Sequence, residues 1–267
     1  KQCLILGNLH QTIGALPEAS VVYRRALELD PNNIEAHTKL AEIAVSCGSK
    51  EDAAREYHEI SQLALHTGNI SEAINCLTKS ISLSPGNQEF YEEIADIYLS
   101  QNNITKSNEF LLLLAAIKEK DQGINESIPI LQKILSTDQN HFIAREKLAI
   151  AYESIHSNSQ AIQEYSKLAE YFKINNQLDN AILAWTKALK LNPESTDLRS
   201  ILAHQYIQSN RKDEAVEHLL WLTHYYVQCN DLKEAKSNVQ SVLDIYPQHI
   251  EAQDLLAEIF AKEGDNK

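Results

Sequence analysis

The stretch that decides the fold is residues 178–193, which read LDNAILAWTKALKLNP. Its apolar residues recur at intervals of three and four, the spacing that places side chains on one face of an α-helix. These residues are Ala181, Ile182, Trp185 and Ala188. Pro193 ends the pattern, because proline has no N–H with which to continue a helix. The stretch therefore predicts an amphipathic helix that packs by one face, with Trp185 as a structural residue on that face.

The same pattern returns at intervals of 54 residues along the chain. Five columns of like residues recur at this spacing: a proline column, an aliphatic column, two columns of small residues and a bulky column. The columns are Pro31, Pro85, Gln139, Pro193 and Pro247; Leu40, Ile94, Leu148, Leu202 and Leu256; Ala41, Ala95, Ala149, Ala203 and Ala257; Ala19, Ala73, Ser127, Ala181 and Ala235; and Tyr23, Leu77, Leu131, Trp185 and Val239. Such internal repetition is typical of a solenoid built from stacked helices.

Each unit has the apolar spacing of three helices, with turns between them. We therefore expect an all-α fold, an α-solenoid of about fifteen antiparallel helices without strands. The chain is predicted to be a single domain over 1–267, with units of approximately 1–48, 49–102, 103–156, 157–210 and 211–267. Because it opens inside a helical pattern and has no Met, we expect it to be a fragment of a longer protein.

Composition excludes several classes of function. Hydrophobic residues make up 43% and charged residues 23%, as in a folded protein, and no apolar run is long enough for membrane insertion. The net charge of −13, with no basic cluster, argues against nucleic acid as a partner. The cysteines Cys3, Cys47, Cys76 and Cys229 are widely spaced, which favours buried thiols in a reducing compartment and hence a cytoplasmic protein.

The columns resemble the tetratricopeptide repeat family. In the first unit the resemblance rests on Leu6, Gly7, Ala19, Tyr23, Ala26 and Pro31. A second match, at Leu40, Ala41, Gly48, Ala53 and Tyr57, follows 34 residues later, and a third, at Gly68, Ala73, Leu77 and Pro85, follows after only 20. The spacing suggests a variant of the repeat with a 54-residue unit of three helices, in which the helix over residues 51–66 serves in two overlapping repeats.

The resemblance implies a scaffold or adaptor that binds a partner protein or peptide along an inner face. The helices that follow the proline column would line that face, and they carry a series of acids. The predicted partner-binding residues are Glu35, Glu42, Glu89, Glu92, Asp96, Glu146, Glu153, Glu251, Asp254 and Glu258, together with Trp221 and His224. A basic segment of a partner would suit these acids. The alternative is that they form the solvated face of amphipathic helices.

Motifs for catalysis are absent from the sequence, so we expect no enzyme activity, no cofactor and no metal. His218 and His224 are six residues apart and lie on different faces of a helix, so they cannot share a metal ion. A second possibility is the regulatory or substrate-recruiting array of an enzyme whose catalytic domain lies outside this sequence. RNA binding by a helical repeat is a third, which the acidic balance disfavours. The sequence leaves the oligomeric state open.

Overall fold

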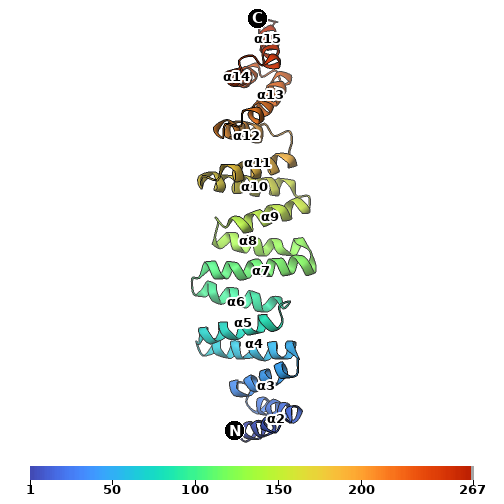
Figure 1. The fold of residues 1–267 in the computed structure, drawn as a ribbon, viewed down its shortest axis with the longest axis vertical. Helices are drawn as coiled ribbons and strands as arrows, with labels where there is room; N and C mark the ends of the chain where they lie inside the picture. The colour runs from blue at the N-terminus through green and yellow to red at the C-terminus, as the bar shows by residue number, and fades with distance from the viewer. Residues whose placement is uncertain (266–267) are drawn as a thin grey trace. The chain divides into compact units, whose positions relative to one another are not determined.

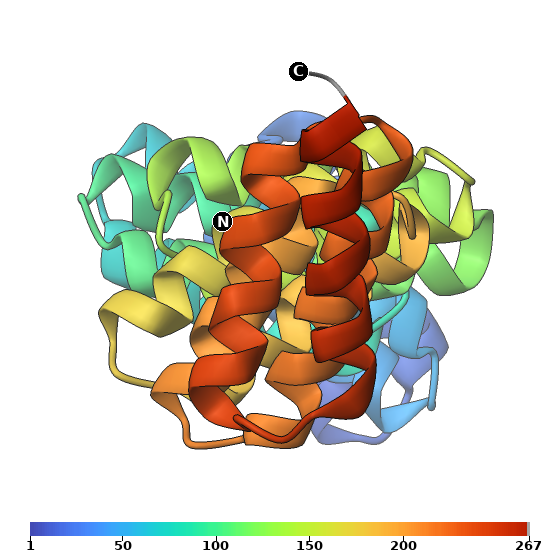
Figure 2. The same ribbon diagram turned by 90° about the horizontal axis from the view of Figure 1, so that it is seen from above.

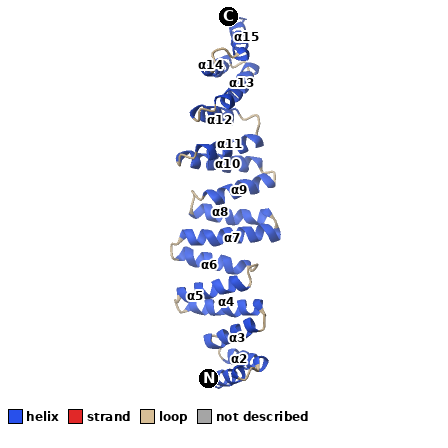
Figure 3. Ribbon diagram, in the orientation of Figure 1, coloured by secondary structure: helices blue, strands red, loops and turns tan. Residues whose placement is uncertain are grey.

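The computed structural model describes residues 1–265, and within them it contains fifteen α-helices, one short 3-10 helix and no strand (Figures 1 and 3). Sequential helices are antiparallel neighbours, so the predicted all-α array is confirmed. The helices are α1 (Gln2–Thr12), α2 (Leu16–Leu29), α3 (Ile34–Ser46), α4 (Lys50–His66), α5 (Ile70–Leu83), α6 (Gln88–Ser100), α7 (Ile104–Gln122), η1 (Ile124–Ser127), α8 (Ile128–Thr137), α9 (Phe142–Ser154), α10 (Asn158–Ile174), α11 (Leu178–Leu191), α12 (Thr196–Gln208), α13 (Lys212–Gln228), α14 (Leu232–Ile245) and α15 (Ile250–Asp265).

Contacts within the chain group it into two compact units. The first unit is residues 1–139, with helices α1 to α8, and the second is residues 140–267, with helices α9 to α15. In the second unit, α13, α14 and α15 pack side by side, in orange to red in Figure 2. We describe each unit by itself, and the expectation of one domain over 1–267 stays a prediction.

The turns between helices repeat as regularly as the helices. The second residue after α3, α6, α9 and α12 has a left-handed backbone in every case: Gly48 (φ 76°), Asn102 (φ 59°), His156 (φ 58°) and Asn210 (φ 58°). A left-handed residue after a helix lets its N–H close the last turn, and glycine and asparagine adopt this conformation at least cost. The sharp reversals that make the helices antiparallel are therefore encoded locally.

The alanine column that begins with Ala41 marks where neighbouring helices come closest. Ala41, Ala95 and Ala149 are completely buried, and Ala203 is 2% exposed. Ala203 packs in a cluster with Val216 and Leu219 of the next helix, α13. The fifth member, Ala257, is exposed, because α15 has no later helix beside it within the described residues. The column is thus a contact of successive helices and not a requirement of each helix alone.

The bulky column fills the interior of each repeat. Tyr23, Leu77, Leu131, Trp185 and Val239 are all no more than 1% exposed, which confirms that Trp185 is a structural residue. Gly7 on α1 leaves the space that the Tyr23 ring occupies. A Cβ atom at Gly7 would lie 2.6 Å from the Tyr23 ring, so only glycine permits this approach. A small residue on one helix thus makes room for a large residue on the next.

The exposure of the four cysteines differs from the prediction that all of them are buried. All are free, but only Cys76 is buried; Cys3 is half-buried, and Cys47 and Cys229 are exposed. Both exposed cysteines stand directly after a helix, at the ends of α3 and α13, where the chain turns through solvent. The prediction that all four are buried was therefore wrong for Cys47 and Cys229. The burial of all four cysteines therefore cannot serve as an argument for a reducing compartment.

We predict that Ala203→Leu lowers the free energy of unfolding by about 1–3 kcal/mol, because the added atoms overpack the α12–α13 contact. Urea unfolding followed by circular dichroism measures the change. Ala257→Leu is the matched control, since the same substitution in the same column then falls on an exposed surface. Equal losses in the two variants would contradict a role for the column in helix contact.

Candidate partner-binding surface

The predicted acids fall into two groups, one in each compact unit. In the first unit, the five acids on α3 and α6 are all exposed: Glu35, Glu42, Glu89, Glu92 and Asp96. In the second unit, Glu146 on α9 is half-buried, whereas Glu153 on α9 and the three acids of α15, Glu251, Asp254 and Glu258, are exposed. A single acidic series along the whole chain stays a prediction, because each unit is described separately.

About half of these carboxylates already have partners within the chain. The pairs are Glu42 with Lys39 (2.9 Å), Asp96 with Lys133 (2.8 Å), Glu146 with Lys187 (3.3 Å), Glu251 with His224 (3.0 Å) and Glu258 with Lys262 (2.9 Å), and the Tyr165 hydroxyl donates to Glu153 at 2.7 Å. Among the described residues, the side chains of Glu35, Glu89, Glu92 and Asp254 make no such pair. The charge that is open to a partner is therefore smaller than the sequence suggests.

Helix α6 has the most concentrated negative charge. Glu89, Glu92, Glu93 and Asp96 follow the i, i+3, i+4, i+7 spacing of one helix face, and α6 contains no basic residue. Asn87 caps the helix and accepts a hydrogen bond from the Glu89 backbone N–H at 3.1 Å. Negative side chains in the first turn also suit the positive end of the helix dipole. The acidic face is therefore compatible with a stable helix.

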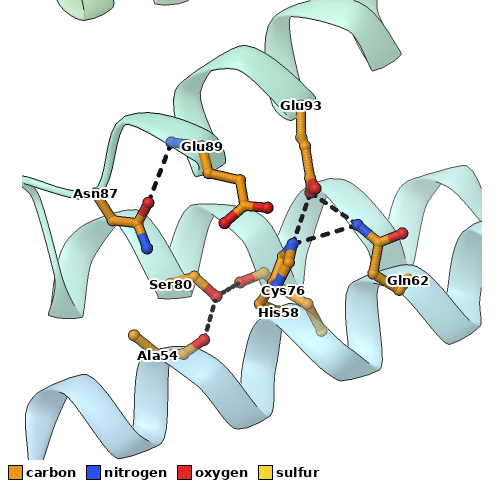
Figure 4. A network of polar contacts seen from close by, with 8 residues as sticks. All are labelled: Ala54, His58, Gln62, Cys76, Ser80, Asn87, Glu89 and Glu93. Atoms are coloured by element: carbon orange, nitrogen blue, oxygen red, sulfur yellow. Dashed lines mark hydrogen bonds and ion pairs between the residues drawn. The ribbon is translucent and has the colours of Figure 1, made fainter.

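Glu93 joins α6 to α4 through two side chains. Its Oε2 atom lies 2.8 Å from Nε2 of His58 and accepts a hydrogen bond from Gln62 at 2.8 Å (Figure 4). The hydrogen bond to Glu93 raises the pKa of His58 above its usual value, although burial opposes the shift. The His58 ring also packs at a tilt against Phe90, with ring centres 5.0 Å apart. Sequence analysis missed this group, because it considered only pairs of histidines as a possible cluster.

One column of polar side chains ties each turn after a proline to the helix that follows. The donor is six residues after the carbonyl oxygen that accepts its hydrogen bond. The pairs are His37 to Pro31 (3.0 Å), Tyr91 to Pro85 (3.1 Å), Arg199 to Pro193 (3.0 Å) and Gln253 to Pro247 (3.0 Å). Side chains of four different types thus donate to the carbonyl oxygen at the equivalent position of four repeats. The column could have been found from the 54-residue spacing, since every member has an N–H or O–H donor.

Residues of this donor column also contact the next helix, and the side chain that they meet there differs between repeats. His37 Nδ1 lies 2.7 Å from Glu56, and Arg145 makes a largely buried ion pair with Glu164 at 2.6 Å. Both ring nitrogens of His37 face acceptors, which favours the doubly protonated ring. Burial lowers the pKa of His37, but the hydrogen bonds to Glu56 and Pro31 outweigh it, so the net shift is upward. His218 has the opposite shift, because burial and the charge of Arg199 lower its pKa.

Trp221 is half-buried on α13 and lies between two other side chains. The Arg199 guanidinium sits over its ring at 3.9 Å, and the Tyr225 ring stacks on it with centres 5.4 Å apart. Such stacking keeps the indole in one position while leaving part of it open. The neighbouring His224 is exposed and pairs with Glu251 of α15. Trp221 and His224 therefore belong to one surface of the second unit, over α12, α13 and α15.

The second unit also has a hollow of about 410 Å³ over α9, α10 and α11. Phe142 and Leu183 at this hollow are 39% and 56% exposed, which is high for side chains of their type. The lining residues are Phe142, Glu146, Leu168, Phe172, Gln177, Asn180, Leu183, Ala184 and Lys187. The combination of apolar walls with one ion pair is typical of a site that accepts a side chain of another molecule.

Fifteen helices in antiparallel neighbouring pairs, joined by recurring turns, define the helical-repeat class of protein. Residues 7–48 match the model described as TPR repeat, and residues 54–87 match the tetratricopeptide repeat model. Over these residues the chain is similar to the tetratricopeptide repeat family. Over the described residues, none of the helices has the length and apolar character needed to cross a membrane.

Two relatives are similar to the chain at low identity. The chain is 25% identical over 202 residues to human protein O-mannosyl-transferase TMTC1, a match that covers 74% of this chain and 20% of that protein. It is 22% identical over 210 residues to the BBSome complex member BBS4 homolog of Drosophila melanogaster, covering 74% of this chain and 43% of that protein. The chain thus matches less than half the length of either relative.

A solved structure that aligns with the chain is the C-terminal part of a TPR repeat-containing protein from Cytophaga hutchinsonii. The identity is 14%, and the alignment covers 95% of this chain and 99% of that chain with a TM-score of 0.25. The similarity concerns the fold alone, and at this TM-score it carries no argument about how the helices are arranged.

We predict that His37→Gln changes how stability depends on pH. Glutamine can keep the bond to Pro31, as Gln253 does to Pro247, but it loses the charged pair with Glu56. Because the folded-state pKa of His37 is raised, its contribution is complete below the unfolded value of 6.5 and is lost as pH rises through the folded value.

The advantage of the wild type over His37→Gln in melting temperature should therefore be largest at acid pH and shrink towards alkaline pH. Thermal unfolding over a pH series measures it. His218→Gln is the comparison, since the lowered pKa of His218 makes the wild type lose stability as pH falls below 6.5. A difference between wild type and His37→Gln that is constant with pH would contradict the assignment.

Proposed function

We propose that this chain is a non-catalytic scaffold or adaptor that binds a partner protein through the surfaces of its repeats. The observation that supports this most directly is the acidic face of α6. It presents four carboxylates without a basic residue on the same helix, and the side chain of Glu92 is exposed and has no partner within the described residues. A basic segment of a partner would complement this face, and the attraction between the opposite charges would increase the association rate.

The first unit provides a second point for the same partner. Glu35 on α3 is exposed and, within the part of the chain that the structure describes, makes no ion pair. By contrast, Glu42 and Asp96 already pair with Lys39 and Lys133, so a partner would have to displace those lysines. We therefore assign the contact with a basic segment to Glu35 and Glu92 ahead of the other predicted acids.

The repeat itself suits this role. We propose that the three-helix, 54-residue unit is the building block, in which each long helix serves in two overlapping tetratricopeptide repeats. In support, α3, α6, α9, α12 and α15 begin at residues 34, 88, 142, 196 and 250, a constant interval of 54. Each long helix, such as α4, also packs against the helix on either side of it in the chain.

A second candidate is an accessory array of an enzyme. The observation in its favour is the similarity to human protein O-mannosyl-transferase TMTC1, of which the matched region is 20%. In that case the repeats would recruit or position a substrate for a catalytic domain elsewhere in the full protein. The sequence of the complete gene distinguishes the two candidates, because only the second requires a catalytic domain.

We predict that Glu35→Lys combined with Glu92→Lys weakens binding of the partner about tenfold, through repulsion of its basic segment. The partner is first captured from an extract with the wild-type chain and purified, and its affinity is then measured by calorimetry at low and high salt. The matched control is Glu109→Lys with Glu119→Lys, two exposed acids of α7 that give the same change in net charge.

The control pair should bind like the wild type, and wild-type affinity should fall as salt rises, because the screening length shortens. An affinity that is independent of salt, or an equal loss in both charge-reversed pairs, would refute binding through Glu35 and Glu92.

We predict that Trp221→Ala also weakens binding of the partner. The loss of affinity should exceed about tenfold if the indole anchors the contact with the second unit. Trp221→Phe should keep most of the affinity, since it preserves a ring under Arg199. Melting temperature is measured on the same samples. A large fall in melting temperature with unchanged affinity would assign Trp221 to packing within the chain instead.

A further inference from the structure

The structure brings together three side chains that the proposed function does not use as a group. One imidazole nitrogen of His58 and one carboxylate oxygen each of Glu89 and Glu93 all lie within 4.8 Å of one another (Figure 4). His58 lies on α4 and the two glutamates on α6. These three atoms are of the types that bind first-row transition metals in proteins.

The backbone explains why the two glutamates act together. Glu89 and Glu93 are four residues apart on α6, so their side chains lie one above the other on the same helix face. Asn87 holds the first turn of α6 in place by capping the Glu89 N–H. Two ligands from one helix turn and one from the neighbouring helix give a chelating arrangement in which little backbone movement is needed.

The ligand orientations are supported by surrounding residues. The side chains of His58 and Glu93 are 17% and 27% exposed, and the His58 ring packs against Phe90. Gln62 donates to the Glu93 carboxylate at 2.8 Å and so limits its rotation. Outer residues of this kind commonly orient metal ligands and tune their affinity. Glu89 is exposed, which leaves an open side through which an ion and water can enter.

The local charge also favours a dication. Exposed Glu59 on α4 adds negative charge next to His58 in the chain, and α6 contains no basic residue. Such a concentration of one sign raises the local concentration of cations. Two carboxylates and one imidazole would carry a net charge of −2 with the ring neutral, which a divalent ion would balance.

We propose that His58, Glu89 and Glu93 form a binding site for Zn²⁺ or a similar first-row divalent ion. The imidazole nitrogen and carboxylate oxygens are all ligand types that Zn²⁺ accepts, and three protein ligands leave a fourth position for water. Ca²⁺ requires six to eight oxygen ligands and Mg²⁺ holds its water strongly, so neither suits this group. Cys76, also drawn in Figure 4, is not a member of this group, and its thiol donates a hydrogen bond to Glu72 at 3.4 Å instead.

Comparison with the other histidine–glutamate pairs shows what is distinctive about this one. His37 pairs with Glu56 and His224 pairs with Glu251, but among the described residues neither has a third ligand within reach. Only at His58 does a second carboxylate, Glu89, complete the set. Because the ligands come from α4 and α6, a bound ion would fix two helices that α5 separates in sequence.

The test uses the purified 267-residue chain with any histidine tag removed and metals stripped with a chelator. Zn²⁺ is titrated by calorimetry, and melting temperature is measured with and without it. We expect one ion per chain and a higher melting temperature with Zn²⁺, since an ion that binds only the folded state stabilises it. Co²⁺ in place of Zn²⁺ should give the absorption bands of a four- or five-coordinate site.

Glu89→Gln is the decisive variant. Its side chain makes no hydrogen bond or ion pair within the described residues, so the substitution should leave the metal-free fold and melting temperature unchanged while reducing Zn²⁺ affinity at least about tenfold. Glu109→Gln is the matched control, with the same loss of charge at an exposed glutamate of the next helix, α7, but no ligand role, and His224→Gln removes a surface histidine elsewhere. Both controls should bind like the wild type.

Three results would overturn the proposal. The first is no binding to the wild type at micromolar Zn²⁺, and the second is an affinity in Glu89→Gln equal to that of the wild type. The third is an equal loss in Glu89→Gln and Glu109→Gln, which would indicate general attraction to an acidic surface. Partner binding through Glu35 and Glu92 is measured separately and without metal, so either proposal can fail while the other stands.

Discussion

The close approach of antiparallel helices at small residues is the constraint on which the rest of this structure depends. Where Ala41, Ala95, Ala149 and Ala203 are buried, the neighbouring helix comes near enough for the bulky column to fill the remaining space. Larger residues would hold the helices apart and leave cavities around Tyr23 or Trp185. Each unit is therefore stabilised by many similar contacts between neighbours and not by one central core.

A second regular feature keeps the helices in register. The left-handed residues after α3, α6, α9 and α12 close each turn, and the donors His37, Tyr91, Arg199 and Gln253 bind the carbonyl before each helix start. The donors differ in chemistry because the carbonyl oxygen requires only an N–H or O–H group. This tolerance lets each repeat vary its second contact, from the His37–Glu56 pair to the Arg145–Glu164 pair, without losing the turn.

The surface is where the repeats become different from one another. The buried columns keep residues of similar size or polarity. By contrast, the column of Glu59, Leu113, Lys167 and Trp221 contains residues of unrelated chemistry. Acids, an aromatic stack and an apolar hollow thus occur on equivalent frameworks. A framework that is fixed inside and variable outside is the physical basis for proposing partner binding, because recognition can change without disturbing the helix contacts.

The sequence by itself determined the helices, their antiparallel order and the buried columns, because periodicity, turn residues and proline positions are local signals. It also identified the tetratricopeptide resemblance and the structural role of Trp185. Of the acids predicted to bind a partner, all but the half-buried Glu146 are exposed, and their role in binding stays a prediction. The exposure of Cys47 and Cys229 was missed, because a cysteine at a helix end gives no periodic signal.

Only the tertiary structure decided which acids are open to a partner. Lys133 and Asp96 are 37 residues apart, and Lys187 and Glu146 are 41 apart, so no local pattern reveals that they neutralise each other. The group of His58, Glu89 and Glu93 is equally invisible, since one helix contributes the imidazole and another the carboxylates. Side chains meet across helices through packing and rotamer choice, and these depend on three-dimensional contacts that the order of residues does not display.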